Sequence, residues 1–278
     1  STADWRPEAI RDTVQSACAI ARHTAADPYA GLADPKRLAR EAPELDLYHP
    51  WALSAEDAIA LARDALAIAA RCSAALNAIV DALSWHLYFA TAAPTALDDA
   101  LQAVARALAV DRNDALAWRG RGWLMLVSGK LPEAAADFQR SLELNPNDAV
   151  AQARLGICEA VSGDPPGGLR RCVQALRLSP RDPARFHLLD NLVWAQFAAQ
   201  AYDDAIDSAR QSLREADFAG TRLCLVLCLV GAGEMARAAA ELRALEMVAP
   251  DMVAARLAGV WLASDPEVRG REVAFLNA

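Results

Sequence analysis

Four histidines are the side chains of this 278-residue chain best suited to acid–base catalysis or metal binding. They stand far apart, and none belongs to a His-Glu-x-x-His motif of the kind that binds catalytic zinc. The sequence also contains no Gly-x-Ser-x-Gly turn, no phosphate-binding loop and no Gly-x-Gly-x-x-Gly motif. We therefore predict that the chain is not an enzyme and needs no cofactor. The histidines are His23, His49, His86 and His187.

Two cysteines, Cys224 and Cys228, are spaced to lie on one face of a helix, where two thiolates could begin a metal site. No histidine or carboxylate has a spacing that completes such a site, so we predict no metal centre. All six cysteines lie within apolar helical stretches, a pattern typical of small buried side chains in a reducing compartment. This usage predicts a cytoplasmic protein. The other four are Cys18, Cys72, Cys158 and Cys172.

The paired carboxylates and the glycine-rich turn have structural explanations. Aspartate pairs at 98–99 and 203–204 stand at predicted helix N-termini, where each charge stabilises the helix dipole by about 0.3–1 kcal/mol. The turn at 164–168 lacks the Lys and Ser/Thr of a phosphate loop, and no strand precedes it. Neither feature indicates catalysis.

The elements that position these residues are predicted to be helices throughout. Hydrophobic residues make up 54% of the chain, and alanine, the strongest helix former, is abundant, so the composition favours an all-α fold. The 36 acidic residues outnumber the 28 basic ones, and this net charge of -8 argues against direct binding of nucleic acid or anionic lipid. The longest apolar run, 223–230, is too short to span a membrane.

A 34-residue period runs through the middle of the chain. Gly129 and Gly163 are 34 residues apart, and so are Pro146 and Pro180. Gln200 stands where another unit would carry its turn glycine. The pattern resembles the tetratricopeptide repeat, in which each unit is two antiparallel helices joined by a tight turn and ended by a proline. The resemblance implies a right-handed α-solenoid in which small residues let paired helices approach closely.

The solenoid is predicted to occupy residues 54–265 in about five units, which are clearest at 115–250. Residues 1–53 are predicted to form a helix and an extended connector that pack on the array. Residues 266–278 are predicted to be a C-terminal cap or a truncated end. Outside the clearest units, helical periodicity predicts helices at 54–70, 72–90, 95–110 and 252–263.

Residues 56–278 resemble the repeat regions of bacterial class III adenylate cyclases and of CadC-like winged-helix regulators. The sequences Ala-Leu-Arg-Leu-Ser-Pro-Arg-Asp-Pro at 175–183 and Tyr-Asp-Asp-Ala-Ile at 202–206 carry the resemblance. Those families place the array beside a cyclase or DNA-binding domain, and neither domain is in this chain. The resemblance implies a sensory or regulatory region of a bacterial signalling or transcription-regulating protein.

Residues 5–70 resemble a helical segment in the N-terminal domain of the TldD/PmbA protease family. The stretches 25–35, 43–51 and 54–70 carry this resemblance. The family's His-Glu-x-x-x-His zinc site has no counterpart here, and neither has the β-rich remainder of its fold. The resemblance implies shared ancestry of a segment or a fusion, and it supplies another alternative function, an accessory subunit of a TldD-like peptidase.

The concave face of the predicted array is the candidate binding site, because the first helices of successive units line it. This face combines apolar side chains with arginine and tryptophan, which are common at binding hot spots. The residue set that clamps a peptide carboxylate in chaperone-binding repeats is absent. We therefore predict a protein partner that inserts a hydrophobic helix or peptide. The predicted contact residues are Leu116, Arg119, Trp123, Leu126, Ile157, Val161, His187, Asn191, Trp194 and Leu227.

Other occupants of the concave face remain open at this stage. The face could pack against residues 5–53 of the same chain, or against a second copy in a self-associated dimer. A small ligand is a further alternative. A substitution at Trp123 separates these cases, because a contact residue affects partner binding whereas a core residue affects stability.

Overall fold

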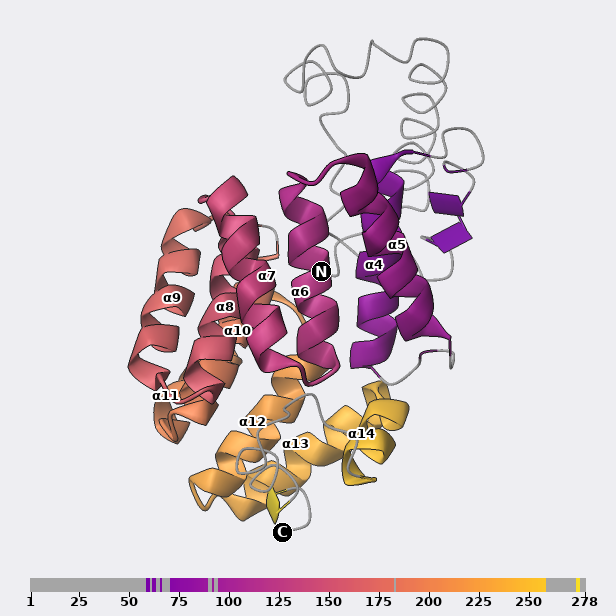
Figure 1. The fold of residues 1–278 in the computed structure, drawn as a ribbon. Coiled ribbons are helices and arrows are strands. Elements are labelled where there is room, and N and C mark those ends of the chain that lie inside the picture. Colours follow the sequence, from indigo (N-terminus) through magenta and orange to yellow (C-terminus); the bar gives the residue numbers. More distant parts are fainter. Residues whose placement is uncertain are drawn as a thin grey trace.

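The computed structural model describes residues 59–60, 62–63, 66, 71–89, 92, 95–182, 184–258 and 274–275. Within these residues the chain is helical, with no strand, and eleven complete helices run from α4 to α14 (Figure 1). The all-α prediction is confirmed. The predicted helix and connector at 1–53 lie outside the described residues, as do most of the helix at 54–70 and most of the segment 266–278.

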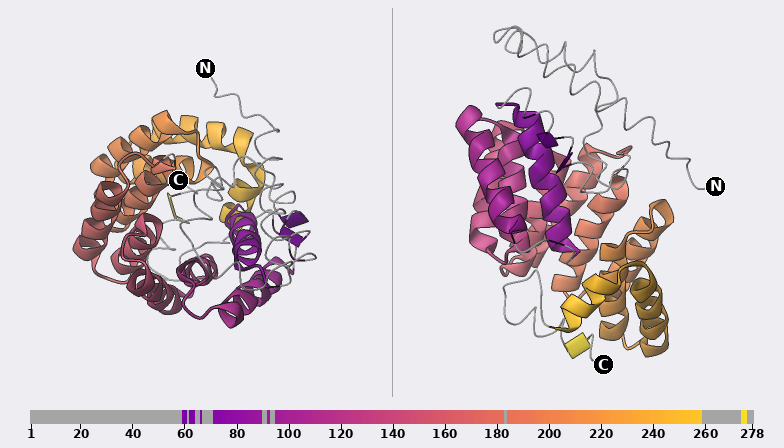
Figure 2. Two further views of the ribbon diagram at one scale, coloured as in Figure 1. Left: turned by 90° about the horizontal axis from the view of Figure 1, so that it is seen from above. Right: turned by 90° about the vertical axis from the view of Figure 1, so that its right-hand side faces the viewer.

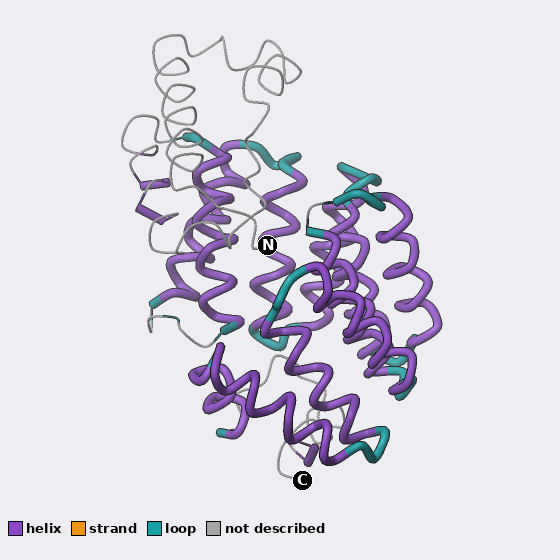
Figure 3. Tube along the Cα trace, turned by 180° about the vertical axis from the view of Figure 1, so that it is seen from behind, coloured by secondary structure: helices purple, strands orange, loops and turns teal. Residues whose placement is uncertain are grey.

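Ten of the helices form five successive pairs, and a single helix follows them. The two helices of each pair pack against each other along the chain (Figure 3). The pairs are α4 (Ser73–Tyr88) with α5 (Ala96–Val110), α6 (Ala115–Val127) with α7 (Leu131–Leu144), α8 (Ala149–Val161) with α9 (Pro165–Leu178), α10 (Arg185–Ala198) with α11 (Tyr202–Glu215), and α12 (Ala219–Gly231) with α13 (Met235–Val248). The last helix is α14 (Pro250–Leu257).

The pairs stack so that the first helix of each unit contacts the first helix of the next. Helices α4, α6, α8, α10 and α12 form an inner layer, and their partners lie outside it. Viewed from above, the stack bends into a ring in which α14 returns beside α4 (Figure 2). A hydrogen bond from Arg256 to the backbone oxygen of Tyr88 joins these two helices.

Aspartates cap the starts of two successive inner helices, α6 and α8, at the repeat period. Asp114 accepts hydrogen bonds from the backbone N–H groups of Leu116 (2.9 Å) and Ala117 (3.1 Å). Asp148, which is 34 residues later, accepts one from Ala151 (2.9 Å). Each cap satisfies donors that the first turn of a helix leaves free.

The turns within four of the five pairs share a left-handed residue. Gly129, Gly163 and Gly233 have φ values of 74°, 103° and 79° in the second, third and fifth pairs. The fourth pair has Gln200 at φ 58° in the same place. Glycine adopts this conformation without strain, whereas a side chain disfavours it. The repeat therefore keeps the turn geometry even where it departs from the glycine pattern.

The helices α8 and α9 cross at glycines. A Cβ atom on Gly168 would lie 2.3 Å from the backbone oxygen of Gly156, and one on Gly156 would lie 2.7 Å from the oxygen of Gly168. These distances are shorter than any real contact of that kind, so the crossing requires glycine on both helices. The glycine-rich turn at 164–168 thus begins a close-packed helix.

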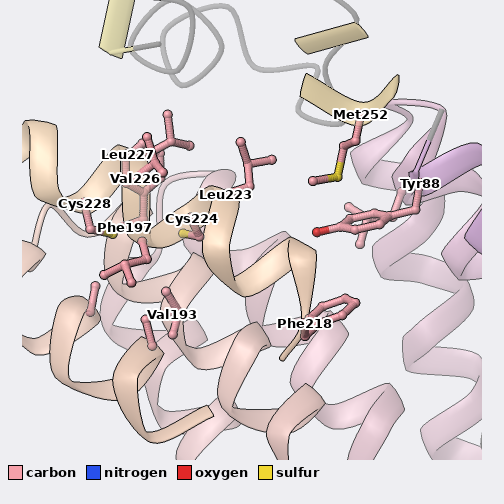
Figure 4. Close-up of a cluster of buried hydrophobic side chains, with 14 of the residues drawn as sticks. Tyr88, Val193, Phe197, Phe218, Leu223, Cys224, Val226, Leu227, Cys228 and Met252 are labelled. Atoms are coloured by element: carbon pink, nitrogen blue, oxygen red, sulfur yellow. The ribbon is translucent and has the colours of Figure 1, made fainter. Parts of the chain in front are cut away.

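One large buried cluster runs through the inner layer from α4 to α14. It includes Tyr88, Trp123, Phe218 and Leu227, together with Met252 of the last helix. The ring of Tyr88 lies between Met252 and Phe218 (Figure 4). The core is therefore continuous around the ring. No helix among the described residues is long and apolar enough to cross a membrane.

Candidate partner-binding surface

One position recurs on four consecutive inner helices. Trp123, Ile157, Trp194 and Leu227 each stand six residues before the left-handed turn residue of their unit. Equivalent positions of stacked units point the same way, so these four side chains form a row along the inner layer. All four were among the predicted contact residues.

Four of the ten predicted contact residues are at least partly exposed in the structure, and six are buried. Ile157, Val161 and Trp194 are half-buried, and Leu116 is 36% exposed. Because α8 and α10 pack together, the three half-buried side chains lie on neighbouring helices, and we call them the α8–α10 patch. The other six are buried in the chain itself: Arg119, Trp123, Leu126, His187, Asn191 and Leu227.

An aromatic cluster accounts for the burial of Trp123 and His187. Trp85 of α4 has its ring centroid 5.5 Å from that of Trp123 and 5.2 Å from that of His187. It also lies 5.9 Å from Phe218, which precedes α12. These are edge or tilted contacts within the favourable range for aromatic pairs. Rings from four units therefore meet on the inner side of the ring of helices.

Buried charges lie beside the aromatic cluster. The Arg119 guanidinium donates to the Asp148 carboxylate at 3.0 Å, and both side chains are almost fully buried. The Arg154 guanidinium stacks over the Trp123 ring at 4.1 Å from its centroid. Burial raises the pKa of Asp81, while the charges of Arg119 and Arg154 oppose that rise. A buried pair that loses one partner leaves an uncompensated charge, so this network fixes the geometry of the inner face.

Two neighbouring residues on α10 have strongly shifted pKa values. Burial lowers the pKa of His187 well below its ordinary value, and the charges of Arg154 and Arg119 lower it further. Burial raises the pKa of Asp190 to about 7, against the opposing effect of the hydrogen bond that Thr221 donates to it at 2.9 Å. His187 is consequently neutral in the folded chain near pH 7.

Most of the cysteine thiols among the described residues are buried in the helical core. Cys158, Cys172, Cys224 and Cys228 are buried, and Cys72 is half-buried. Burial raises the pKa values of Cys158 and Cys172 to about 12, which makes both thiols poor nucleophiles at neutral pH. Among the described residues, no group of three or more His, Cys, Asp or Glu side chains is arranged to hold a metal ion.

Known proteins share this arrangement of helices. Residues 115–148 match the family described as tetratricopeptide repeat. A tetratricopeptide repeat protein from Parabacteroides merdae ATCC 43184 superposes with a TM-score of 0.54 at 15% identity, covering 98% of this chain and 100% of that one. The Cut9–Hcn1 structure of the APC/C superposes with a TM-score of 0.58 at 14% identity, covering 96% of this chain and 47% of that one.

The chain folds as a tetratricopeptide-repeat solenoid. The described helix pairs α4–α13 are its repeat units, and the inner layer is the set of first helices that line the concave face of such solenoids. At these identities the two structures show the fold of this chain and no more. Its partners have to be argued from its own side chains.

A second likeness concerns a short stretch. Over 62 residues, or 22% of this chain and 14% of the relative, the sequence is 53% identical to metalloprotease PmbA of Escherichia coli O157:H7. A PmbA homologue of Haemophilus influenzae is 42% identical over 65 residues, again covering 14% of that relative. The chain therefore spans about one seventh of the length of these proteins, which does not show that it belongs to their family.

Several residues that shape the inner face of the solenoid were not predicted from the sequence. Trp85 and Tyr88 end α4, Phe218 stands before α12, and Arg154 and Asp190 lie inside α8 and α10. The aromatic run at 85–89 was a visible signal in an otherwise aliphatic helix. Its partners were not visible, because they depend on how tightly the solenoid curves.

Proposed function

We propose that the chain is a non-enzymatic interaction module that binds an apolar helix or peptide of a partner protein at the α8–α10 patch. The observation that carries this proposal is the exposure of the patch. Ile157 and Trp194 are the half-buried middle members of a row whose end members are buried, and Val161 is half-buried one turn after Ile157. Partly exposed aliphatic and tryptophan side chains on a rigid wall are suited to a hydrophobic partner.

The spacing within the patch suits a helical ligand. Ile157 and Val161 are four residues apart, so they lie one above the other on α8. Trp194 stands beside them on α10. Two apolar anchors one turn apart on a partner helix would meet this wall in register.

The buried members of the predicted contact set have a supporting role in this proposal. Trp123 and Leu227 pack at the two ends of the row, and the Arg119–Asp148 pair ties α6 to α8. His187 and Asn191 are buried on α10 and Leu126 on α6, whereas Leu116 is exposed near the start of α6. The supporting residues hold the contact side chains in place and do not touch the ligand.

A pull-down with matched variants tests the proposal. The baits are the wild-type chain, a Val161→Glu/Trp194→Ala double variant and a Val173→Glu control, in which Val173 is an exposed apolar residue of the outer helix α9. We expect a protein that is retained by the wild type and by the control but lost from the double variant, with helical content unchanged by circular dichroism. Equal recovery on all three baits would overturn the proposal.

The PmbA likeness favours a second candidate, an accessory role beside a TldD-like peptidase. The supporting observation is the 53% identity over 62 residues. Size-exclusion chromatography of the purified chain mixed with a TldD homologue tests it. Co-elution of the two proteins supports this role, whereas separate elution at concentrations well above the micromolar range excludes it.

A further inference from the structure

A groove opens between the last helix pairs, beside a different face of α12 from the one that carries Leu223 and Leu227. It is lined by residues of α11, α12 and α13 and has a volume of about 420 Å³. Leu225 and Leu229 of α12 face it, about 200° around the helix from Leu223 and Leu227, which face the inner core. The groove is therefore separate from the α8–α10 patch.

The floor of the groove is apolar. Leu225 and Leu229 are buried, and Leu213 of α11 is half-buried beside them. The volume is within the range of about 300–1,000 Å³ that is typical of ligand clefts. There is thus room for an apolar side chain of a ligand to rest on Leu213, above the nearly covered Leu225 and Leu229.

The walls of the groove carry four arginines and one acidic side chain, although the whole chain is acidic. The arginines are Arg210, Arg214, Arg222 and Arg237, and the acidic side chain is Glu241. Arginine presents a fixed fork of N–H donors that matches a carboxylate in geometry as well as charge. The lining is therefore complementary to an anionic ligand.

One of the four arginines has a structural role, because its ion pairs connect neighbouring helices. Arg222 donates to Asp217 at 2.5 Å and to Glu241 at 2.8 Å, so it ties α12 to α13 at the edge of the groove. Its side chain is the least exposed of the ion-paired arginines in the groove. We assign it to the wall rather than to ligand contact.

The other three arginines are available to a ligand. Arg210 pairs with Asp207 at 3.2 Å, and Arg237 pairs with Glu234, in both cases on the exposed surface. Surface pairs of this kind stabilise a protein by about 1 kcal/mol or less, so a partner carboxylate can replace them. Arg214 is exposed and forms no ion pair among the described residues.

We propose that this groove binds a short acidic segment of a partner protein that carries one apolar side chain. Carboxylates of the segment pair with Arg210, Arg214 and Arg237, and the apolar side chain rests on Leu213, above the floor formed by Leu225 and Leu229. A module of this kind contacts its partners through two faces, the inner patch for an apolar helix and the outer groove for an acidic segment.

Fluorescence anisotropy with a labelled peptide, acetyl-Glu-Asp-Glu-Leu-Glu-Asp-Glu-amide, tests the proposal on the full chain. We expect saturable binding that weakens when salt is raised from about 50 to about 300 mM, because the contacts are charged and exposed. Replacing the central leucine by serine should weaken binding about fivefold. No saturable binding below about 1 mM peptide would overturn the proposal.

Matched charge-reversal variants locate the site. Arg210→Glu/Arg214→Glu should weaken peptide binding at least tenfold. The control, Arg170→Glu/Arg177→Glu, makes the same charge change on two exposed arginines of α9, and it should weaken binding less than twofold. Equal losses of peptide binding in the two variants would show a general charge effect and overturn the assignment of the peptide to this groove. Tighter binding of a labelled single-stranded oligonucleotide than of the peptide would also overturn the proposal.

Discussion

Arg256 of α14 donates a hydrogen bond of 2.7 Å to the backbone oxygen of Tyr88 in α4, although the two residues are 168 positions apart. The Arg256 side chain is 1% exposed, and its guanidinium lies 5.9 Å from the centre of the Tyr88 ring. The last described complete helix is thereby fastened to the first. The solenoid is closed at this point, and the rings of its inner aromatic cluster are buried.

Arg256→Met should lower the free energy of unfolding by about 2 kcal/mol, because it leaves the Tyr88 carbonyl without its buried donor. Arg243→Met is the matched control, since Arg243 is exposed on α13. Urea unfolding followed by circular dichroism measures both variants. Equal stability of the two variants would show that the α4–α14 contact does not hold the ring closed.

Asp148→Ala should cost about 3–5 kcal/mol of stability, because it removes the partner of a buried arginine as well as a helix cap. Asp164→Ala removes only a cap, the bond of 2.9 Å from the Gly167 N–H, and should cost about 1 kcal/mol. Thermal unfolding of the two variants measures the difference. Similar losses of stability in the two variants would mean that the Arg119–Asp148 pair does not stabilise the fold.

Gln200→Gly should raise the free energy of unfolding by about 1 kcal/mol, because it relieves a side chain at φ 58°. The reverse exchange at the equivalent turn, Gly163→Gln, should lower it by a similar amount, since φ is 103° there and the space around the residue is open. Urea midpoints of the two variants should therefore move in opposite directions. A shift in the same direction would contradict the shared turn geometry.

Asp190→Asn should remove a pH dependence of stability between about pH 4 and pH 7. The folded chain holds a proton on Asp190 up to a pKa of about 7, whereas an unfolded aspartate releases it near 3.8. Stability from this group is therefore complete at low pH and is lost as the pH rises through that window. The loss integrates to at most about 4 kcal/mol.

Asparagine imitates the protonated carboxyl and can still accept from Thr221, so this variant should match the wild type near pH 4 and exceed its stability at pH 8. Titration of His187 acts in the opposite sense at acid pH, because the folded chain keeps that ring neutral. This effect of His187 is the same in the wild type and in Asp190→Asn, so it cancels when the stability of one is subtracted from that of the other. Chemical unfolding across pH 4–8 measures that difference, and a difference independent of pH would contradict the assignment.

Much of the fold could be predicted from the sequence, because the residues that determine the helices and turns of each repeat lie within that repeat. The glycines at the turns, the prolines after Asn145 and Ser179, and the alternation of apolar positions fix where helices begin and end. The predicted helix at 95–110 is observed as α5, and the one at 72–90 as α4. These are local properties, and they do not depend on what the solenoid meets elsewhere.

The candidate site could be predicted only in part. The row of Trp123, Ile157, Trp194 and Leu227 follows from the repeat period alone. The burial of Trp123 at one end does not, because it depends on the contact with Trp85, which belongs to another unit and itself contacts Phe218 of a third. Small rotations between successive units add up to the curvature of the solenoid, and this total cannot be predicted from the sequence of a single repeat. The resemblance to cyclase and CadC-like regulators stays a prediction.

Site-directed photo-crosslinking tests most directly whether a partner contacts the α8–α10 patch. A benzoylphenylalanine placed at Val161 is compared with one placed at Val173 on the outer face of α9, each in the chain expressed in cells. We predict adducts with a second protein from position 161, fewer or none from position 173, and loss of the adducts when Trp194→Ala is added. Adducts only with the chain itself at position 161, or equal adducts at both positions, would contradict the proposed interaction surface.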